Sequence, residues 1–213
     1  MIDTRHEFRG LFDLYVPIGL AVFFIITVVV LYAVIRYRRR GDELPRARTE
    51  APVPELLYVI GLAAIAALLV GRTFDVESKV DRTSSRPGLE VQVTASKWNW
   101  RFTYPQYGIS LFGGSVSPAV LVVPSETTVR FEMTSLDVIH SFFVPLLRFK
   151  RDAFPEKSTR FDLVFDHPGS TVGRCAEFCG LHHADMLFDV KTLRPADFSR
   201  WVMQRRAGSG GRA

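Results

Sequence analysis

The feature that most constrains this chain is an uncharged run of 22 residues, Leu14–Ile35. A helix of this length and composition can span the hydrocarbon core of a bilayer. A second apolar run, Leu56–Gly71, is shorter and reaches a spanning length only if its polar flanks lie in the interfaces. No amphipathic period marks this run as one-sided, which argues against a single anchor followed by a buried core helix. We therefore predict a transmembrane hairpin over residues 1–74, with helices at about 14–35 and 55–74.

The segment between the two apolar runs predicts the orientation of the hairpin. Its arginines are Arg36, Arg38, Arg39, Arg40, Arg46 and Arg48. Because arginine-rich loops stay on the cytoplasmic side, we expect residues 36–54 to form a cytoplasmic loop. Both termini, and the sequence from Asp75 onward, are then predicted on the periplasmic or outer side of the inner or plasma membrane.

Residues 75–206 have the pattern of an all-β domain. Short segments of alternating or continuous apolar residues are separated by turn signals, which is typical of a Greek-key sandwich or barrel. The clearest segments are Val91–Ala95, Trp98–Tyr104, Ala119–Val123, Val129–Met133, Phe161–Phe165 and Phe188–Val190. The alternation changes phase at Ser96–Lys97, which predicts a β-bulge. We expect a final helix at Pro195–Arg206 and a disordered tail over 207–213.

One stretch near the C-terminal end concentrates side chains that bind transition metals. Cys175 and Cys179 are the only cysteines in the sequence, and His183 and Met186 follow shortly after them. His140, which follows an earlier predicted strand, is the candidate for a further ligand. Thiolate, imidazole and thioether groups suit copper better than magnesium or calcium. Two thiolates four residues apart could also bridge a pair of metal ions.

Other interpretations of this stretch explain fewer of its residues. Thiols outside the cytoplasm normally oxidise, but a Cys175–Cys179 disulfide would leave His140, His183 and Met186 without a role. A structural zinc site normally uses a Cys-x-x-Cys motif and no methionine. A mononuclear blue-copper site uses one cysteine. The residue set therefore favours a copper centre with two cysteines.

The motif Cys-x-Glu-x-Cys-Gly-x-x-His-x-x-Met, preceded by Asp-Val-x-His-Ser, resembles subunit II of the haem–copper cytochrome c oxidases. Two apolar runs, a Trp-x-Trp segment, the histidine segment and the cysteine loop follow one another as they do in that family. The resemblance implies a cupredoxin-like Greek-key domain that carries the dinuclear copper centre CuA. By position, the copper ligands are His140, Cys175, the backbone carbonyl of Glu177, Cys179, His183 and Met186.

The resemblance also implies how electrons arrive. Trp98 matches the tryptophan that receives them from a c-type cytochrome; the alternative is that it only fills the core with the aromatic residues that follow it. Between Lys97 and Ser125 the chain has no acidic residue, whereas mitochondrial relatives place acids here that steer a basic cytochrome c. Residues 75–213 carry 18 Lys+Arg and 15 Asp+Glu. We therefore expect a donor that is acidic, neutral or tethered and that docks partly through apolar contacts.

Further residues match positions at the boundaries of the family's subunit. The side chain of Glu177 matches a magnesium ligand at the boundary with subunit I, and otherwise is a solvated acid. Lys150 and Asp152 match a segment that packs on subunit I, although an exposed charged turn explains them equally well. The family usually continues that segment with Gly-Arg, where this chain has Glu156–Lys157. Glu55 matches a carboxylate near the entrance of a proton channel.

The resemblance implies subunit II of a membrane-bound terminal oxidase. CuA would accept single electrons from a c-type cytochrome and pass them to haem in subunit I, where oxygen is reduced to water and protons are translocated. The expected partners are subunit I, a subunit III, the cytochrome and the lipid bilayer, with no nucleic acid. Two alternatives stay open: the CuA subunit of a nitric oxide reductase, and a free-standing membrane-tethered copper carrier.

Overall fold

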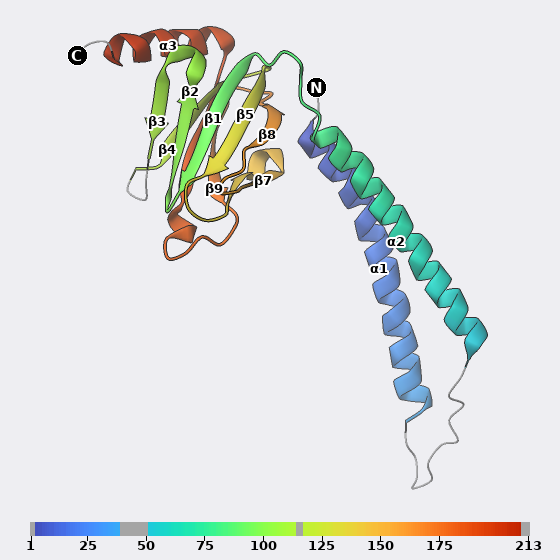
Figure 1. Ribbon diagram of the computed structural model, residues 1–213. Coiled ribbons are helices and arrows are strands. Elements are labelled where there is room, and N and C mark those ends of the chain that lie inside the picture. Colours follow the sequence, from blue (N-terminus) through green and yellow to red (C-terminus); the bar gives the residue numbers. More distant parts are fainter. Residues whose placement is uncertain (1–2, 39–50, 114–116, 210–213) are drawn as a thin grey trace. The chain divides into compact units, whose positions relative to one another are not determined.

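A computed structural model describes residues 3–38, 51–113 and 117–209 (Figure 1). The chain divides into two compact units, which we describe separately. One unit, residues 6–78, is helical. The other contains residues 79–213 together with the first five residues, and it is the β domain.

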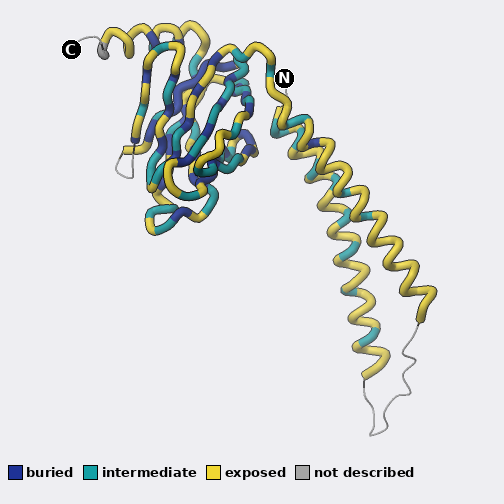
Figure 2. Tube along the Cα trace, in the orientation of Figure 1, coloured by how far each residue is buried: buried dark blue, intermediate teal, exposed yellow. Residues whose placement is uncertain are grey.

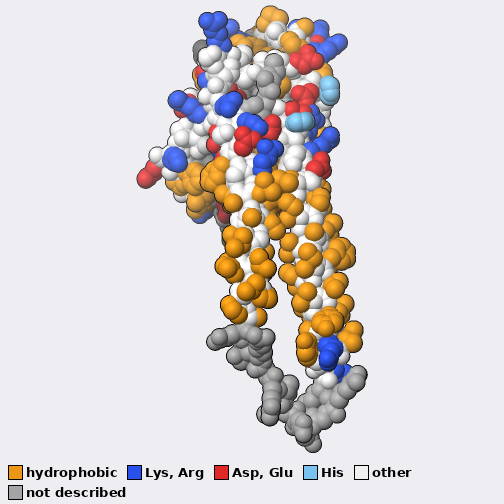
Figure 3. All heavy atoms as spheres, turned by 90° about the vertical axis from the view of Figure 1, so that its right-hand side faces the viewer, with side chains coloured by type: hydrophobic (Ala, Val, Ile, Leu, Met, Phe, Trp, Pro, Cys, Tyr) orange, Lys and Arg blue, Asp and Glu red, His pale blue; other side chains and the backbone are white. Residues whose placement is uncertain are grey.

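The helical unit consists of two long apolar helices, α1 (Thr4–Arg36) and α2 (Pro52–Val80). Both are long and apolar enough to cross a membrane, and their apolar stretches are exposed along the whole length (Figures 2 and 3). The hydroxyl of Tyr15 on α1 lies 2.5 Å from the hydroxyl of Thr73 on α2 and donates to the carbonyl of Leu69 at 3.1 Å. The helices therefore form a hairpin, as the sequence predicts.

Both helices are longer than the apolar runs that predict them. Polar turns extend α1 before Leu14 and extend α2 beyond Phe74. Residues 39–50, with Arg39, Arg40, Arg46 and Arg48 of the predicted cytoplasmic loop, lie outside the described residues.

The β domain is a sandwich of two five-stranded sheets, with strand orders β3-β2-β1-β5-β8 and β4-β10-β9-β6-β7. The strands are β1 (Leu89–Ser96), β2 (Asn99–Tyr104), β3 (Ile109–Phe112), β4 (Ala119–Pro124), β5 (Thr128–Ser135), β6 (His140–Val144), β7 (Phe149–Ala153), β8 (Thr159–Val164), β9 (Gly169–Cys175) and β10 (Leu187–Leu193). Two pairs, β1 with β5 and β4 with β10, are parallel. The predicted β-sandwich is thus confirmed.

The core lies between the sheets and is rich in aromatic rings. Strict alternation along β1 and β5 buries every second side chain, as a half-exposed sheet requires. Phe131 stacks on Phe161 in the first sheet at 5.2 Å between ring centroids, and Phe142 stacks on Phe188 in the second at 4.8 Å. Trp100 packs against both rings of the second sheet. These contacts give a rigid base to the loops at the end of the sandwich.

The predicted β-bulge at Ser96–Lys97 is wrong. β1 ends at Ser96, β2 begins at Asn99, and these two residues face each other across an antiparallel hairpin. Lys97 and Trp98 form its two-residue turn. The phase of the alternation changes there because the chain reverses direction, not because a residue is inserted.

The final helix α3 (Pro195–Ser209) runs past the predicted end at Arg206. It buries Phe198 and Val202, and Trp201 packs edge-on against Tyr104 with 5.5 Å between ring centroids. Residues 207–209 of the predicted disordered tail belong to the end of this helix, and residues 210–213 lie outside the described residues.

Candidate metal centre

Three loops meet at one end of the sandwich. Because β1 and β5 run parallel, with Ala95 beside Ser135, the turns that follow them lie at the same end. β9 ends there too, since Cys175 pairs with Phe142 near the start of β6. The eleven residues between β9 and β10 therefore lie beside the hairpin turn of Trp98 and the segment before β6. In Figure 1 this end lies opposite α3.

Cys175, the last residue of β9, has three candidate donor atoms around its sulfur. Its Sγ lies 3.9 Å from Sγ of Cys179 and 3.8 Å from Nδ1 of His140. The backbone carbonyl oxygen of Glu177 lies 3.3 Å away. His140, the first residue of β6, has no exposed surface, and both cysteines are only 4% exposed.

Cys179 has its own neighbours on the other side of the sulfur pair. Its Sγ lies 3.5 Å from Nδ1 of His183 and 3.8 Å from Sδ of Met186. Met186 is fully buried. The structure therefore gathers all six donors expected from the sequence around two free thiols.

Backbone hydrogen bonds hold the two ends of this loop together. The N–H of Cys175 donates to the carbonyl of Met186 at 3.0 Å, and the N–H of Ala176 donates to the carbonyl of Ser141 at 3.1 Å. The buried indole of Trp100 also donates to the carbonyl of Met186, at 3.4 Å. The loop thus begins and ends in the sheet, which fixes the positions of its donor atoms.

The structure adds a residue to which the sequence analysis gave no role. The carboxylate of Asp137 lies 2.8 Å from Nε2 of His140 and accepts hydrogen bonds from the backbone N–H groups of Lys97 and Val138, both at 2.7 Å. A proton held on Nε2 leaves Nδ1 free to face Cys175. The available signal was its position three residues before His140 in the motif.

Burial and charge act in opposite directions on the two thiols. Burial is the largest single influence on Cys175 and raises its pKa, but the hydrogen bonds with His140, with the backbone of Glu177 and Ser141 and with Cys179 together outweigh it, and the pKa falls to about 7. Burial raises the pKa of Cys179, and the neighbouring Cys175 raises it further. A metal that takes both as thiolates must therefore displace a proton.

Trp98 lies against the cysteine loop. Its indole N–H donates to the carbonyl of Cys179 at 3.2 Å, and its ring packs edge-on against the ring of His182, 4.8 Å away. Gly180 lies beneath it with φ +113°, and a Cβ there would come within 3.4 Å of the indole. Of the paired histidines, His183 faces the sulfurs and His182 faces Trp98.

The other expected site residues lie at the border of the centre or away from it. Lys150 and Asp152 belong to the edge strand β7, not to a turn. The ammonium of Lys150 lies 3.3 Å from the carboxylate of Glu177 and 3.5 Å from that of Asp152. Glu156, which stands where the family usually has glycine, has φ +57°. This left-handed conformation is one that glycine adopts more readily than other residues.

Glu55 belongs to the first turn of α2 in the helical unit. Its carboxylate accepts a hydrogen bond from the N–H of Ala51 at 3.2 Å. This contact satisfies an otherwise unpaired amide at the helix N-terminus.

The two-sheet sandwich and the cysteine–histidine–methionine cluster in the loop before its last strand define a cupredoxin-like domain. Residues 115–193 match the family described as cytochrome c oxidase subunit II, periplasmic domain. Over these residues the β domain matches this family, and the resemblance found in the sequence is confirmed.

Similar proteins extend the match to most of the chain. "Probable cytochrome c oxidase subunit 2" of Nocardia farcinica is 29% identical over 94% of this chain and 71% of its own length. The cytochrome c oxidase subunit 2 of Corynebacterium diphtheriae is 30% identical over 80% of this chain, and that of Bacillus sp. PS3 is 33% identical over 78%. This chain spans only 63% and 49% of the lengths of these two relatives.

The domain also resembles a solved structure. The periplasmic domain of subunit II of the Bradyrhizobium japonicum cytochrome oxidase superposes with a TM-score of 0.54 and 25% identity, over 59% of this chain and 99% of that one. The family implies a copper centre, and the donors fit one. Two thiols, two imidazole nitrogens, a thioether and a carbonyl are the ligand types that copper prefers to harder cations.

Proposed function

We propose that this chain is the CuA-bearing subunit II of a haem–copper terminal oxidase and accepts single electrons from a c-type cytochrome. The observation that carries the proposal is the convergence of four donor atoms on the two sulfurs, each within 4 Å of one sulfur. When bound, two copper ions bridged by two thiolates would share one electron. Haem in subunit I would receive it and reduce oxygen to water there, with proton translocation.

The ligands would divide into a bridging pair and terminal ligands. Cys175 and Cys179 would bridge the metal ions. His140, Met186, His183 and the carbonyl of Glu177 would supply the remaining ligands, as the resemblance to the family implies. The fit is supported by the burial of both cysteines, of His140 and of Met186.

The protein would contribute rigidity and exclude water. Hydrogen bonds from Cys175 to Met186 and from Ala176 to Ser141 tie the ligand loop to the sheets. Asp137 fixes the ring of His140. Ligands held in one geometry through both redox states keep the reorganisation on electron transfer small, and a weak thioether ligand tunes the potential.

Trp98 would be the residue through which electrons arrive. It stands in the hairpin turn and is only half-buried, while Trp100, Phe102 and Tyr104 fill the core. Its hydrogen bond to the carbonyl of Cys179 makes a short connection from the surface to a copper ligand. The position in the turn supports electron input over simple core packing.

The donor would be a c-type cytochrome without a strongly basic face. Phe178 and Leu181 on the ligand loop are 79% and 84% exposed, and Leu136 beside the Trp98 turn is 68% exposed. The chain has no acid between Lys97 and Ser125. Apolar contact would therefore supply part of the docking, beside the partly exposed carboxylates of Glu177 and Asp185 on the ligand loop.

The remaining assignments concern the membrane complex. Both termini and the β domain would lie on the outer side, and subunits I and III would be partners, with Lys150 and Asp152 at the contact with subunit I. Glu177 would help to bind magnesium there, in place of its ion pair with Lys150. Glu55 would mark the start of a proton path.

Electron paramagnetic resonance of the copper-loaded full chain, purified from membranes, tests the proposal. We expect one unpaired electron split by two equivalent copper nuclei. A spectrum of a single copper ion, or a silent one in the oxidised protein, would overturn the assignment.

A further inference from the structure

The position of Trp98 depends on a small set of contacts. The indole stands in a two-residue turn, half-buried at the end of the sandwich. Its N–H donates a hydrogen bond to the carbonyl of Cys179. Its ring lies over Gly180, which has no side chain that could contact the ring. The ring of His182 packs against it at an interplanar angle of 77°, with 4.8 Å between centroids.

His182 is itself held in place. Its Nδ1 lies 3.4 Å from the carboxylate of Asp185, and the N–H of Asp185 donates back to the carbonyl of His182 at 3.1 Å. Both residues belong to the short 3-10 turn around His183–Asp185. This turn directs the two neighbouring histidines differently: His183 faces Cys179, and His182 faces Trp98.

We propose that His182 is a positioning residue for electron input, which holds the indole of Trp98 against the carbonyl of Cys179. The inference rests on the proposed function, in which Trp98 receives the electron. Edge-to-face aromatic packing is directional, so it restrains the tilt of the indole as well as its distance. Asp185 acts one step further away, by fixing the imidazole.

The consequence is an effect on electron transfer inside the docked complex. Without the imidazole, Trp98 loses one of its restraints and the hydrogen bond to Cys179 forms a smaller fraction of the time. Loss of an aromatic pair of this kind corresponds to about a two- to tenfold change in the equilibrium constant between the bonded and unbonded positions of the indole, and the rate falls by up to that factor. Docking of the donor and the copper ligands should be unaffected.

The test uses the assembled oxidase carrying His182→Ala, His182→Phe or Trp98→Phe. Flash-induced electron transfer from the cytochrome donor gives the first-order rate within the complex and, from its concentration dependence, the docking affinity. We expect His182→Ala to slow the first-order rate about two- to tenfold. The docking affinity and the copper resonance should not change. His182→Phe, which keeps an aromatic edge, should restore most of the rate.

His167→Ala is the matched control, since this exposed histidine follows β8 at the opposite end of the sandwich. It should leave the rate unchanged.

Four outcomes would contradict the proposal. If His182→Ala has the wild-type rate while Trp98→Phe is slow, His182 does not position Trp98. If His182→Phe is as slow as His182→Ala, or if the copper resonance changes in His182→Ala, edge packing on Trp98 is not its role. If Trp98→Phe is not slow, electron input through Trp98 is wrong and this inference fails with it, while the copper resonance still tests the metal assignment.

Discussion

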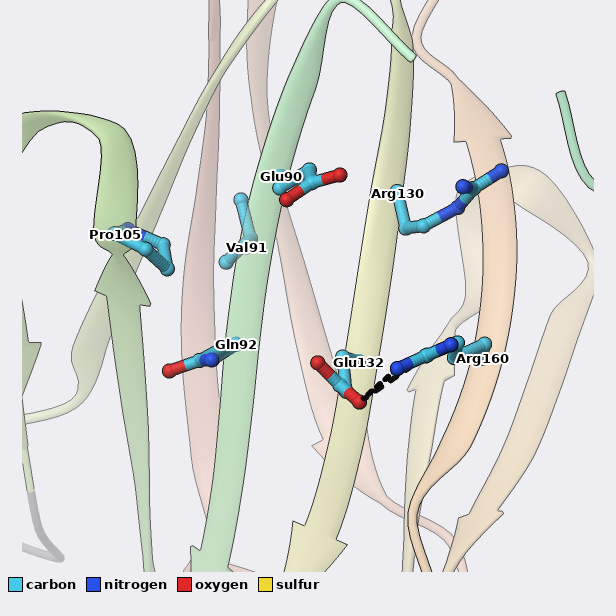
Figure 4. Close-up of a pocket in the computed structure, with 7 residues that line it drawn as sticks. All are labelled: Glu90, Val91, Gln92, Pro105, Arg130, Glu132 and Arg160. Carbon is cyan, nitrogen blue, oxygen red and sulfur yellow. Dashed lines mark hydrogen bonds and ion pairs between the residues drawn. The ribbon is translucent and has the colours of Figure 1, made fainter. Parts of the chain in front are cut away.

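Two regions of the β domain differ in how their polar groups are used. At the metal end the donors are mostly buried and lie within 4 Å of the two sulfurs. The outer face of β1, β5 and β8 instead has a pocket of about 190 Å³ (Figure 4). It is lined by Glu90, Val91, Gln92, Pro105, Arg130, Glu132 and Arg160.

Two arginines that line the pocket form ion pairs with carboxylates on the neighbouring strand. Arg130 faces Asp162 directly across β5 and β8, with 2.8 Å between their atoms, and Glu132 faces Arg160, also at 2.8 Å. Such cross-strand pairs are what a solvated sheet face normally carries. The metal end instead has thiols and imidazoles whose donor atoms could bind a metal ion. Concavity therefore says less about function here than burial and the chemistry of the donors do.

Replacing a thiol at the metal end should have the largest effect. Cys179→Ser removes a proposed bridging ligand, so we expect the dinuclear copper resonance to disappear. Copper affinity should fall by more than the ~10–100-fold that loss of an outer partner costs. Glu132→Gln in the pocket is the control and should keep the resonance and the copper content. A dinuclear signal in Cys179→Ser would contradict the bridging role.

The second-largest effect is expected from replacing Asp137, whose carboxylate contacts Nε2 of His140. Asp137→Asn keeps the size of the side chain but weakens its hold on Nε2 and on the turn before Trp98. We expect about a 10–100-fold loss in copper affinity or electron-transfer rate. Copper titration and flash kinetics measure the two. Wild-type values for both would show that Asp137 serves only the backbone.

Gly180 tests how tightly Trp98 fits the loop. Gly180→Ala forces a side chain into φ +113° and places its Cβ 3.4 Å from the indole, at the lower limit of ordinary van der Waals contact. The backbone strain should cost about 1–3 kcal/mol in the free energy of unfolding, measured in denaturant, and electron input should slow. Gly108→Ala, at φ +67° with no atom within 4 Å, is the control for strain alone. Equal electron-transfer rates in both variants would show that the Cβ does not disturb Trp98.

The smallest effect belongs to the pocket. The hydrogen bond from Arg160 is the largest influence on Glu132 and lowers its pKa below the ordinary 4.5. Because the folded pKa is lower than the unfolded one, the pair stabilises the fold above pH 4.5 and loses this contribution as pH falls through the folded pKa. For such an exposed pair, we expect Glu132→Gln to cost about 0.2–1 kcal/mol at neutral pH. Unfolding measured from pH 7 to pH 3 should show the variant converging with the wild type, and a constant difference would contradict the ion pair.

Residue type and local pattern were enough to predict several parts of this protein. Two uncharged runs predicted the helical hairpin, alternation predicted most of the strands, and soft donors at fixed spacing selected His140, Cys175 and Met186. The local pattern missed that Lys150 and Asp152 lie on a strand, because β7 is short and its side chains are mostly charged. Edge strands tolerate such charges, so their pattern does not distinguish them from turns.

The way in which the loops meet could not be predicted before the strands were seen paired in three dimensions. The hairpin turn placed Trp98 at the surface, where a bulge would have kept it within a strand. The packing of three loops placed the carboxylate of Asp137 against Nε2 of His140. It also placed the ring of His182 against the ring of Trp98. Residue spacing identified the donors because a ligand set is a matter of chemistry. Residue spacing could not identify the residues that hold the donors and Trp98 in place, because contacts between separate loops depend on how the strands pair.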